Sequence, residues 1–272
     1  MNINKNFNDV TIFNGKKIIL IGPTTKDVNK LNLETYDFVF LFGFYINHIE
    51  ELINLKEKYH FSLCRVLGGY NKEDQEKYVL PFDNDIDYYC LAEVHTVNEY
   101  IKENIIDKNK LFSMNNNYKS FGWTTEGKYP TGLPKLLLFF HVNNIKHKEL
   151  FISGFTFYLN IDNSLCYEES CWLEALESSY EELKDKDINS LDDKLKLYLE
   201  LYEGHLKGTL SIKEQQDKYL DFCWNKRTDL TPHCNKLDYN FFLKYLSMYG
   251  NFVKLDKKLK KIVKKYNKLF DV

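Results

Sequence analysis

The sequence lacks the short motifs that identify several large classes of enzyme. Its 272 residues contain no G-x-S-x-G, no H-E-x-x-H and no kinase signature, and no segment repeats at a solenoid period. The chain also has no large excess of charge of one sign, because 37 basic and 39 acidic residues leave a net charge of −2. We therefore expect no nucleic-acid partner, since such partners are bound through a strongly positive surface.

Long apolar runs and paired cysteines are also absent. No run approaches the about 20 apolar residues of a membrane span, and the N-terminus lacks the basic-then-apolar layout of a secretory signal. We therefore expect a soluble chain in the cytoplasm. The cysteines form no C-x-x-C pair and no Cys/His zinc spacing, so we expect reduced thiols. They are Cys64, Cys90, Cys166, Cys171, Cys223 and Cys234.

What the sequence does have is a series of apolar runs that end in glycine turns. Hydrophobic residues make up 44% of the chain, which is ample for a packed core. The run Ile18–Ile21 leads into the turn Gly22–Thr25, and Phe38–Phe42 leads into Gly43. This format predicts strands of a mostly parallel sheet in an α/β fold. The turn Gly22–Thr25 is either a plain strand turn or a resting place for a phosphate, and its single glycine leaves both readings open.

The stretch Lys128–Tyr158 combines signals for a turn, a helix and a strand. Pro130, Thr131 and Gly132 favour a turn and a helix start, where backbone N–H groups can hold an anion. Apolar residues then recur at helical spacing, and Glu149–Gly154 is typical of a buried strand that ends at a glycine. Because ligands bind at the carboxyl ends of strands in α/β sheets, both ends of this stretch could face one pocket.

The remaining pattern predicts how the domain is organised. A helix is expected over 46–58 and a strand over 61–67. From Glu168 to about Leu230 the pattern is helical and charged, which predicts a helical insertion over 161–227 into a single α/β nucleotide-binding domain formed by 1–160 and 228–272. The insertion is either a lid that covers a pocket or a structural subdomain.

Three further groups of residues have two interpretations each. The aspartates Asp83, Asp85 and Asp87 form either a metal site or a solvated turn. His233 stands just before a helix start and is either structural or catalytic. The segment 257–268 interleaves seven lysines with apolar residues, which predicts a basic amphipathic helix. Such a helix either docks on the domain with its lysines in solvent or makes a weak contact with an acidic membrane surface or RNA.

Four features of the chain follow one another in a characteristic order. They are a strand with a G-P-T turn, a second strand, a T-G helix start followed by an S-G-x-x-F-Y strand end, and a histidine five positions before an acidic residue. The stretches that carry them are Ile18–Thr24, Tyr36–Phe40, Tyr129–Leu133 with Glu149–Tyr158, and His233–Asp238. In these features the chain resembles the sialyltransferases, closest to the bacterial family 42 enzymes and more distantly to the animal family 29.

The resemblance implies a Rossmann-like domain of a GT-A-type variant that works without a metal or another cofactor. It would transfer sialic acid or a related keto-sugar, with inversion, from a CMP-linked donor to a glycan or glycoconjugate acceptor. His233 would be the general base, since an imidazole pKa near about 6.5 suits that task. Tyr158 would hydrogen-bond the departing phosphate. The residues that the resemblance assigns to donor binding are Gly22, Pro23, Thr24, Gly43, Lys128, Thr131, Gly132, Gly154 and Thr156.

The chain departs from the family at positions that contact the donor. Leu20-Ile21 and Leu41–Gly43 stand where the family carries asparagines. Lys128 replaces an arginine and Thr156 replaces an aspartate. Three functions therefore remain open: an active glycosyltransferase, a catalytically degenerate relative that serves as a binding or structural subunit, and an unrelated α/β nucleotide-binding protein.

Overall fold

The computed structural model of the chain divides into two compact units, which are described one at a time. The first unit is Met1–Phe155 with Leu237–Val272, and the second is Thr156–Lys236. The insertion expected at 161–227 falls within the second unit. The residues that the structure describes are 9–25, 27–42, 46–67, 79–91, 106–114, 132–155, 157, 176–177, 179–191, 193–212, 214–215, 218–219, 222 and 235–266.

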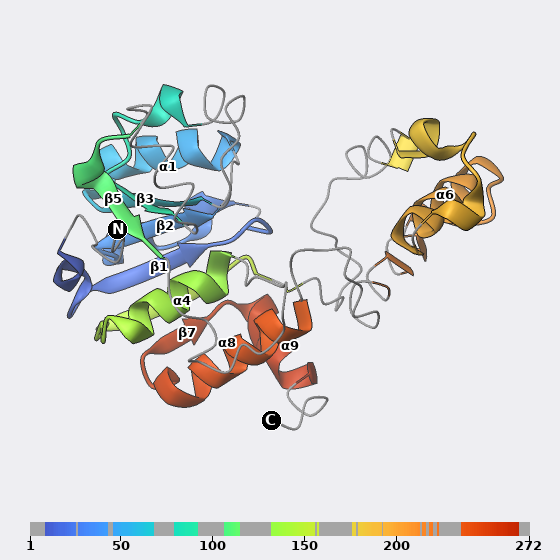
Figure 1. Cartoon of the computed structure of the whole chain (residues 1–272). Coiled ribbons are helices and arrows are strands. Elements are labelled where there is room, and N and C mark those ends of the chain that lie inside the picture. Colours follow the sequence, from blue (N-terminus) through green and yellow to red (C-terminus); the bar gives the residue numbers. More distant parts are fainter. Residues whose placement is uncertain are drawn as a thin grey trace, which may run out of the picture. The chain divides into compact units, whose positions relative to one another are not determined.

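A sheet of seven strands, within the described residues, forms the centre of the first unit (Figure 1). The strand order is β5-β4-β3-β2-β1-β6-β7, and each neighbouring pair runs parallel. The predicted α/β class with a parallel sheet is therefore confirmed. The strands are β1 (Lys17–Ile21), β2 (Phe38–Phe42), β3 (Ser62–Leu67), β4 (Tyr88–Leu91), β5 (Leu111–Ser113), β6 (Glu149–Ser153) and β7 (Val253–Leu255).

Beyond Lys17, every residue of β1 and β2 is apolar, as expected for strands that are covered on both faces. Ile19 of β1 lies between Val39 of β2 and Phe151 of β6. All four residues of Ile18–Ile21 are fully buried, and every residue of β2 is buried. Near-continuous apolar runs are typical of parallel strands with helices on both sides.

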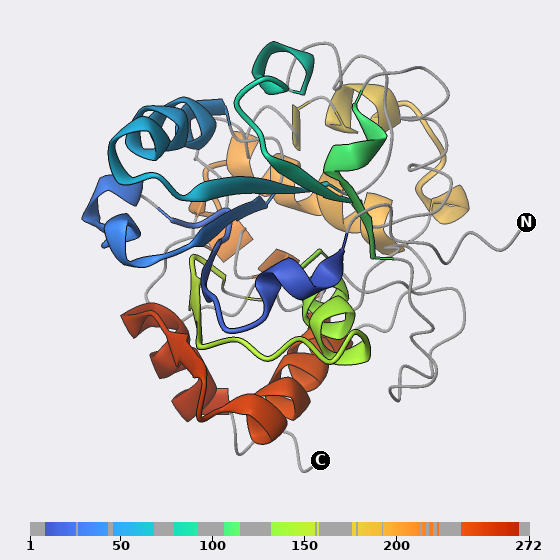
Figure 2. The same cartoon turned by 90° about the vertical axis from the view of Figure 1, so that its left-hand side faces the viewer.

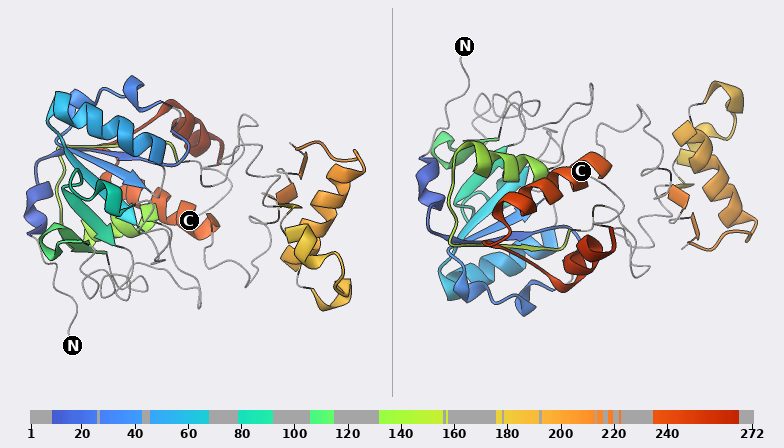
Figure 3. Two further views of the ribbon diagram at one scale, coloured as in Figure 1. Left: turned by 90° about the horizontal axis from the view of Figure 1, so that it is seen from above. Right: turned by 90° about the horizontal axis from the view of Figure 1, so that it is seen from below.

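Helices cover the two faces of the sheet. Figure 3 shows α1 (Ile46–Tyr59) and α9 (Lys257–Tyr266) on one side of the strands, with α4 (Gly132–Val142) and α8 (Asn235–Tyr249) on the other. The bounds of α1 and the start of α4 agree closely with the sequence prediction. Because α4 leads from the edge strand β5 back to β6, the chain returns to the middle of the sheet through this helix.

An aromatic cluster fills the space between the sheet and α4. Phe13 is fully buried at its centre, with ring centroids 4.9 Å from Phe38, 5.1 Å from Phe112 and 6.0 Å from Phe140. Phe13 belongs to a short 3-10 helix that lies beside α4 (Figure 2). Aromatic rings bury large apolar areas, so this cluster is a main source of stability for the α4 face.

Short 3-10 helices occupy several loops. Four of them begin after an aspartate whose carboxylate accepts the N–H of the second residue beyond it, which is a common way to satisfy the first N–H groups of a helix. The 3-10 helices are η1 (Val10–Phe13), η2 (Val28–Lys30), η3 (Leu33–Thr35), η4 (Leu80–Phe82), η5 (Lys108–Lys110) and η7 (Ile188–Ser190).

The second unit is built around α6 (Asp193–Leu206). One cluster of buried residues centres on Leu201, which is fully buried beside Leu176 and Tyr202. Another joins Leu199 to Leu183 and Leu191. None of the helices in the described parts of either unit combines the length and hydropathy that crossing a membrane requires.

Candidate functional site

The order of the strands reverses at β1. The chain adds β2, β3, β4 and β5 on one side of β1, then returns to add β6 and β7 on the other side. In open parallel sheets, ligands bind at the carboxyl ends of the strands where such a reversal occurs. The turn Gly22–Thr25 follows β1 and Gly154 follows β6, so two of the glycine turns identified in the sequence meet at this point.

The two turns are in direct backbone contact. The Gly22 N–H donates to Ser153 O at 2.8 Å, and the Thr24 N–H donates to Gly154 O at 3.0 Å. A Cβ on Gly22 would lie 2.4 Å from Gly154 O, and a Cβ on Gly154 would lie 2.0 Å from Thr25 Oγ1. Gly154 also has a φ of +73°, which favours glycine. Both positions therefore require glycine.

The polar groups that the first turn can offer a ligand are hydroxyls. We call the contact between the turn Gly22–Thr25 and Gly154 the glycine crossing. The N–H groups of Gly22, Thr24 and Thr25 all donate to carbonyl groups within this crossing, and Pro23 has no N–H group. The hydroxyls of Thr24 and Thr25 are buried and form no hydrogen bond with the described part of the chain. Thr25 is only 9% exposed. A buried hydroxyl without a partner costs about 1–3 kcal/mol, so these two oxygens are natural points of attachment for a bound molecule.

Asp256 joins this crossing to β7 and α9. Its carboxylate accepts the N–H of Gly154 at 2.7 Å and the N–H of Leu259, in the first turn of α9, also at 2.7 Å. Its own N–H donates to Ile152 O at 3.0 Å. The sequence analysis missed this residue, although an aspartate just before a lysine-rich helical pattern is a recognisable N-cap signal.

The N-terminus of α4 lies at the same edge of the sheet. A Cβ on Gly132 would be 3.2 Å from the ring of Phe42 and 3.5 Å from Val66, which are near the carboxyl ends of β2 and β3. Phe42 in turn packs edge-on against Phe155, at 4.9 Å between centroids. A Cβ on Gly22 would come within 2.8 Å of Phe155. These contacts connect the α4 N-terminus to the glycine crossing.

The start of α4 is suited to an anion. The first N–H groups of a helix carry partial positive charge and favour anions. Lys135, in the first turn of α4, is only 3% exposed. The sequence analysis missed Lys135, although a single lysine inside the apolar run from Leu133 to Phe140 was a visible signal.

Five of the predicted site residues therefore share the carboxyl edge of the sheet: Gly22, Pro23, Thr24, Gly132 and Gly154. Asp238, which follows His233 in the sequence motif, is 1% exposed in the first turn of α8. The predicted site residues that lie outside the described residues are Gly43, Lys128, Thr131, Thr156, Tyr158 and His233.

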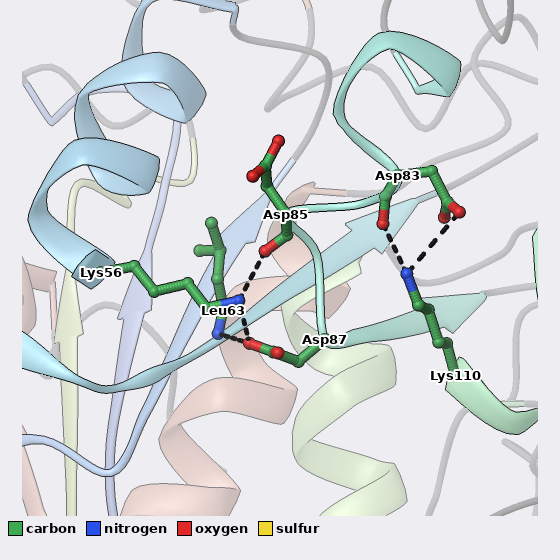
Figure 4. A network of polar contacts seen from close by, with 6 residues as sticks. All are labelled: Lys56, Leu63, Asp83, Asp85, Asp87 and Lys110. Atoms are coloured by element: carbon green, nitrogen blue, oxygen red, sulfur yellow. Dashed lines mark hydrogen bonds and ion pairs between the residues drawn. The ribbon is translucent and has the colours of Figure 1, made fainter.

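The aspartates that the sequence left open as a metal site or a solvated turn lie at the amino ends of the strands, in the loop that leads into β4. Figure 4 shows that Asp87 accepts the N–H of Leu63 at 2.7 Å and pairs with the ammonium of Lys56 at 2.8 Å. Lys110 bonds the carbonyl of Asp83 at 2.5 Å and lies 3.6 Å from its carboxylate. Across the described ranges, no three acidic, histidine or cysteine side chains are grouped to hold a metal. These contacts favour the turn interpretation.

Two of the six cysteines lie in the described strands, and both are free thiols. Cys64 and Cys90 are fully buried, and burial raises the pKa of each thiol above its ordinary value. A thiol with a raised pKa stays protonated at neutral pH and is a poor nucleophile. Neither cysteine is therefore suited to covalent catalysis.

Comparison with known proteins adds no family to this description. No protein-family model matches the chain, and no curated protein or solved structure matches it significantly.

Proposed function

We propose that the chain is a sialyltransferase-like glycosyltransferase with a Rossmann-like domain of a GT-A-type variant. It transfers sialic acid or a related keto-sugar from a CMP-linked donor to an acceptor hydroxyl. One observation carries the proposal: three motif glycines far apart in the sequence, Gly22, Gly132 and Gly154, are linked by contacts at the carboxyl edge where the strand order reverses. That edge is the usual ligand site of such sheets.

In the proposed reaction, His233 takes the proton of the acceptor hydroxyl while the hydroxyl oxygen attacks the anomeric carbon of the sugar. The bond from that carbon to the donor phosphate breaks, and the configuration inverts. Tyr158 donates a hydrogen bond to the departing phosphate. Thr131 and Gly132 hold the donor's negative charge at the α4 N-terminus.

Ligand binding at this edge of the sheet is tested by a nucleotide screen and by removal of the Thr25 hydroxyl. Cytidine, uridine, guanosine and adenosine monophosphates and their sugar conjugates are screened by thermal shift. A ligand at about 100 times its dissociation constant adds about 2.7 kcal/mol of stability. We expect cytidine monophosphate and its sugar conjugate to stabilise the protein. We also expect Thr25→Val to reduce this shift without lowering the melting temperature of the free protein, because the buried hydroxyl has no described partner.

Thr35→Val is the control, since Thr35 is an exposed threonine at the end of η3 whose hydroxyl donates to Asn32 O at 2.9 Å. It removes the same hydroxyl chemistry far from the strand reversal and is expected to leave the ligand shift intact. Stabilisation by another nucleotide alone would reject the cytidine donor. The absence of a shift with every nucleotide would reject the proposal.

A catalytically degenerate relative is the second candidate. It is favoured by the internal use of all N–H groups in the turn Gly22–Thr25, and by Leu20-Ile21 in place of the family's asparagine. The two candidates differ in the effect of His233→Gln on hydrolysis or transfer from a CMP-sugar. An active enzyme loses turnover in this variant and keeps the nucleotide shift, whereas a degenerate relative has no turnover to lose.

A further inference from the structure

The helix α9 concentrates positive charge in a chain that is otherwise acidic. Its ten residues, KKLKKIVKKY, hold six lysines and no acidic residue. The whole chain has 37 basic and 39 acidic residues, so the remainder has 31 basic and 39 acidic. A charge asymmetry of this size indicates a local binding surface rather than a general feature of the fold.

The lysines and the apolar residues of α9 lie on opposite faces. Leu259 and Ile262 are fully buried, so α9 is packed onto the first unit through this side. The exposed lysines follow the spacing i, i+3, i+4, i+7, which places them on one face of a helix, turned away from the buried pair. These residues, which we call the lysine face, are Lys257, Lys260, Lys261 and Lys264.

We propose that the lysine face binds an anionic membrane surface. Charge complementarity identifies the partner: the face has four exposed cations within two helical turns, and each lysine near an acidic leaflet adds to the attraction. The proposal does not depend on the glycosyltransferase function. Because Leu259 and Ile262 are already buried against the protein, the helix binds by electrostatic attraction and does not insert its apolar side into the lipid.

The composition of the face favours lipid over nucleic acid. Nucleic-acid surfaces commonly combine arginine, which forms bidentate bonds to phosphate and bases, with aromatic rings that stack on bases. The chain has two arginines, Arg65 and Arg227, and neither lies in α9. A face made only of lysine point charges suits diffuse attraction to lipid headgroups.

The experiment measures sedimentation of the full chain with vesicles of phosphatidylcholine, with and without phosphatidylserine. We expect binding only to vesicles that contain phosphatidylserine, and release as salt is added. The triple variant Lys257→Gln, Lys260→Gln and Lys264→Gln should bind about a hundredfold more weakly, at about fivefold for each lysine. The corresponding Lys→Arg triple variant should bind like the unmodified protein.

The control variant removes the same net charge from exposed lysines before β5 and β6, by Lys108→Gln, Lys146→Gln and Lys148→Gln. It is expected to bind phosphatidylserine vesicles normally. An equal loss of binding in this variant would overturn the proposal in favour of a net-charge effect. Absence of binding to phosphatidylserine at low salt, binding that salt does not weaken, or displacement of the vesicles by equimolar single-stranded RNA would overturn it as well.

Discussion

Two glycines of the first unit differ in whether the structure leaves room for a side chain. Gly15 and Gly154 both have a left-handed φ, at +68° and +73°. A Cβ on Gly15 would have no atom within 4 Å, whereas a Cβ on Gly154 would clash with the side chain and the backbone nitrogen of Thr25. The pair therefore separates the effect of backbone conformation from the effect of packing.

We predict that Gly154→Ala lowers the free energy of unfolding by about 3 kcal/mol or more, because it adds a clash to the left-handed strain. Gly15→Ala, the matched control, should lower it by only about 1 kcal/mol. Urea denaturation of the three proteins measures both values. Equal losses in the two variants would mean that the close contact between Gly154 and Thr25 does not exist in solution.

His147 is a buried titratable residue whose charge is not accommodated. It is 9% exposed, packs on Phe140 at 4.6 Å between ring centroids, and neither ring nitrogen has a hydrogen-bond partner among the described residues. Burial lowers the pKa of His147 to about 4. The unfolded chain, with a pKa near about 6.5, binds the proton at a higher pH than the folded chain does.

Stability should therefore fall as the pH drops from 6.5 toward 4, by up to about 3 kcal/mol from this residue alone. We predict that His147→Phe removes this part of the pH dependence, because phenylalanine keeps the ring contact and has no proton to bind. Denaturant titrations between pH 4 and pH 8 give the free energy of unfolding at each pH, and the slope of this free energy against pH is compared between the two proteins. An unchanged slope in the variant would show that His147 titrates normally in the folded state.

At the scale of elements, Asp256 connects three of them: it bonds the residue after β6, follows β7 and caps α9. Hydrogen bonds to a charged group contribute about 1.5–3 kcal/mol, and the loss of an N-cap costs about 1 kcal/mol. We predict that Asp256→Ala lowers the free energy of unfolding by about 3 kcal/mol, measured by urea denaturation.

Asp107→Ala is the control for this prediction, since Asp107 caps only η5 through the N–H of Asn109 at 2.9 Å. It should lower stability by about 1 kcal/mol. If both variants lose the same amount, Asp256 acts as an ordinary cap and does not hold the glycine crossing in place.

The elements that the sequence predicted well are those whose ends are marked locally. Apolar runs bounded by glycine gave β1, β2 and β6 nearly to the residue, and the helical period gave α1. The three-residue strands β5 and β7 were missed, because their pairing with a neighbouring strand, and not their own sequence, makes them strands.

In the candidate site, too, some residues are marked by the local sequence and others are revealed only by the fold. Gly22, Gly132 and Gly154 were identified because turns and close backbone contacts leave a glycine in the sequence. The strand order that brings them together, and the burial of Lys135 and Thr25, depend on contacts between distant segments. A single sequence contains no local signal for such contacts, so these features became visible only in the fold.

For the whole molecule, the first unit is made from both ends of the chain, with the second unit inserted between them. The returning segment supplies α8, β7 and α9. Tyr239 and Phe242 of α8 are fully buried, and Tyr245 is 1% exposed. The sheet also needs this segment, since β7 covers the edge of β6. The first unit therefore cannot complete its core until the last residues have been synthesised.

We predict that a chain ending at Lys236 does not fold the first unit, because it loses the buried rings of α8 and exposes the apolar edge of β6, which promotes aggregation. A chain ending at Tyr266 keeps every described element and should unfold at the same urea concentration as the full chain. Soluble expression, gel filtration and urea denaturation compare the three chains. A soluble, cooperatively unfolding chain that ends at Lys236 would mean that β1 to β6 form an independent core and that α8, β7 and α9 are only an appended layer.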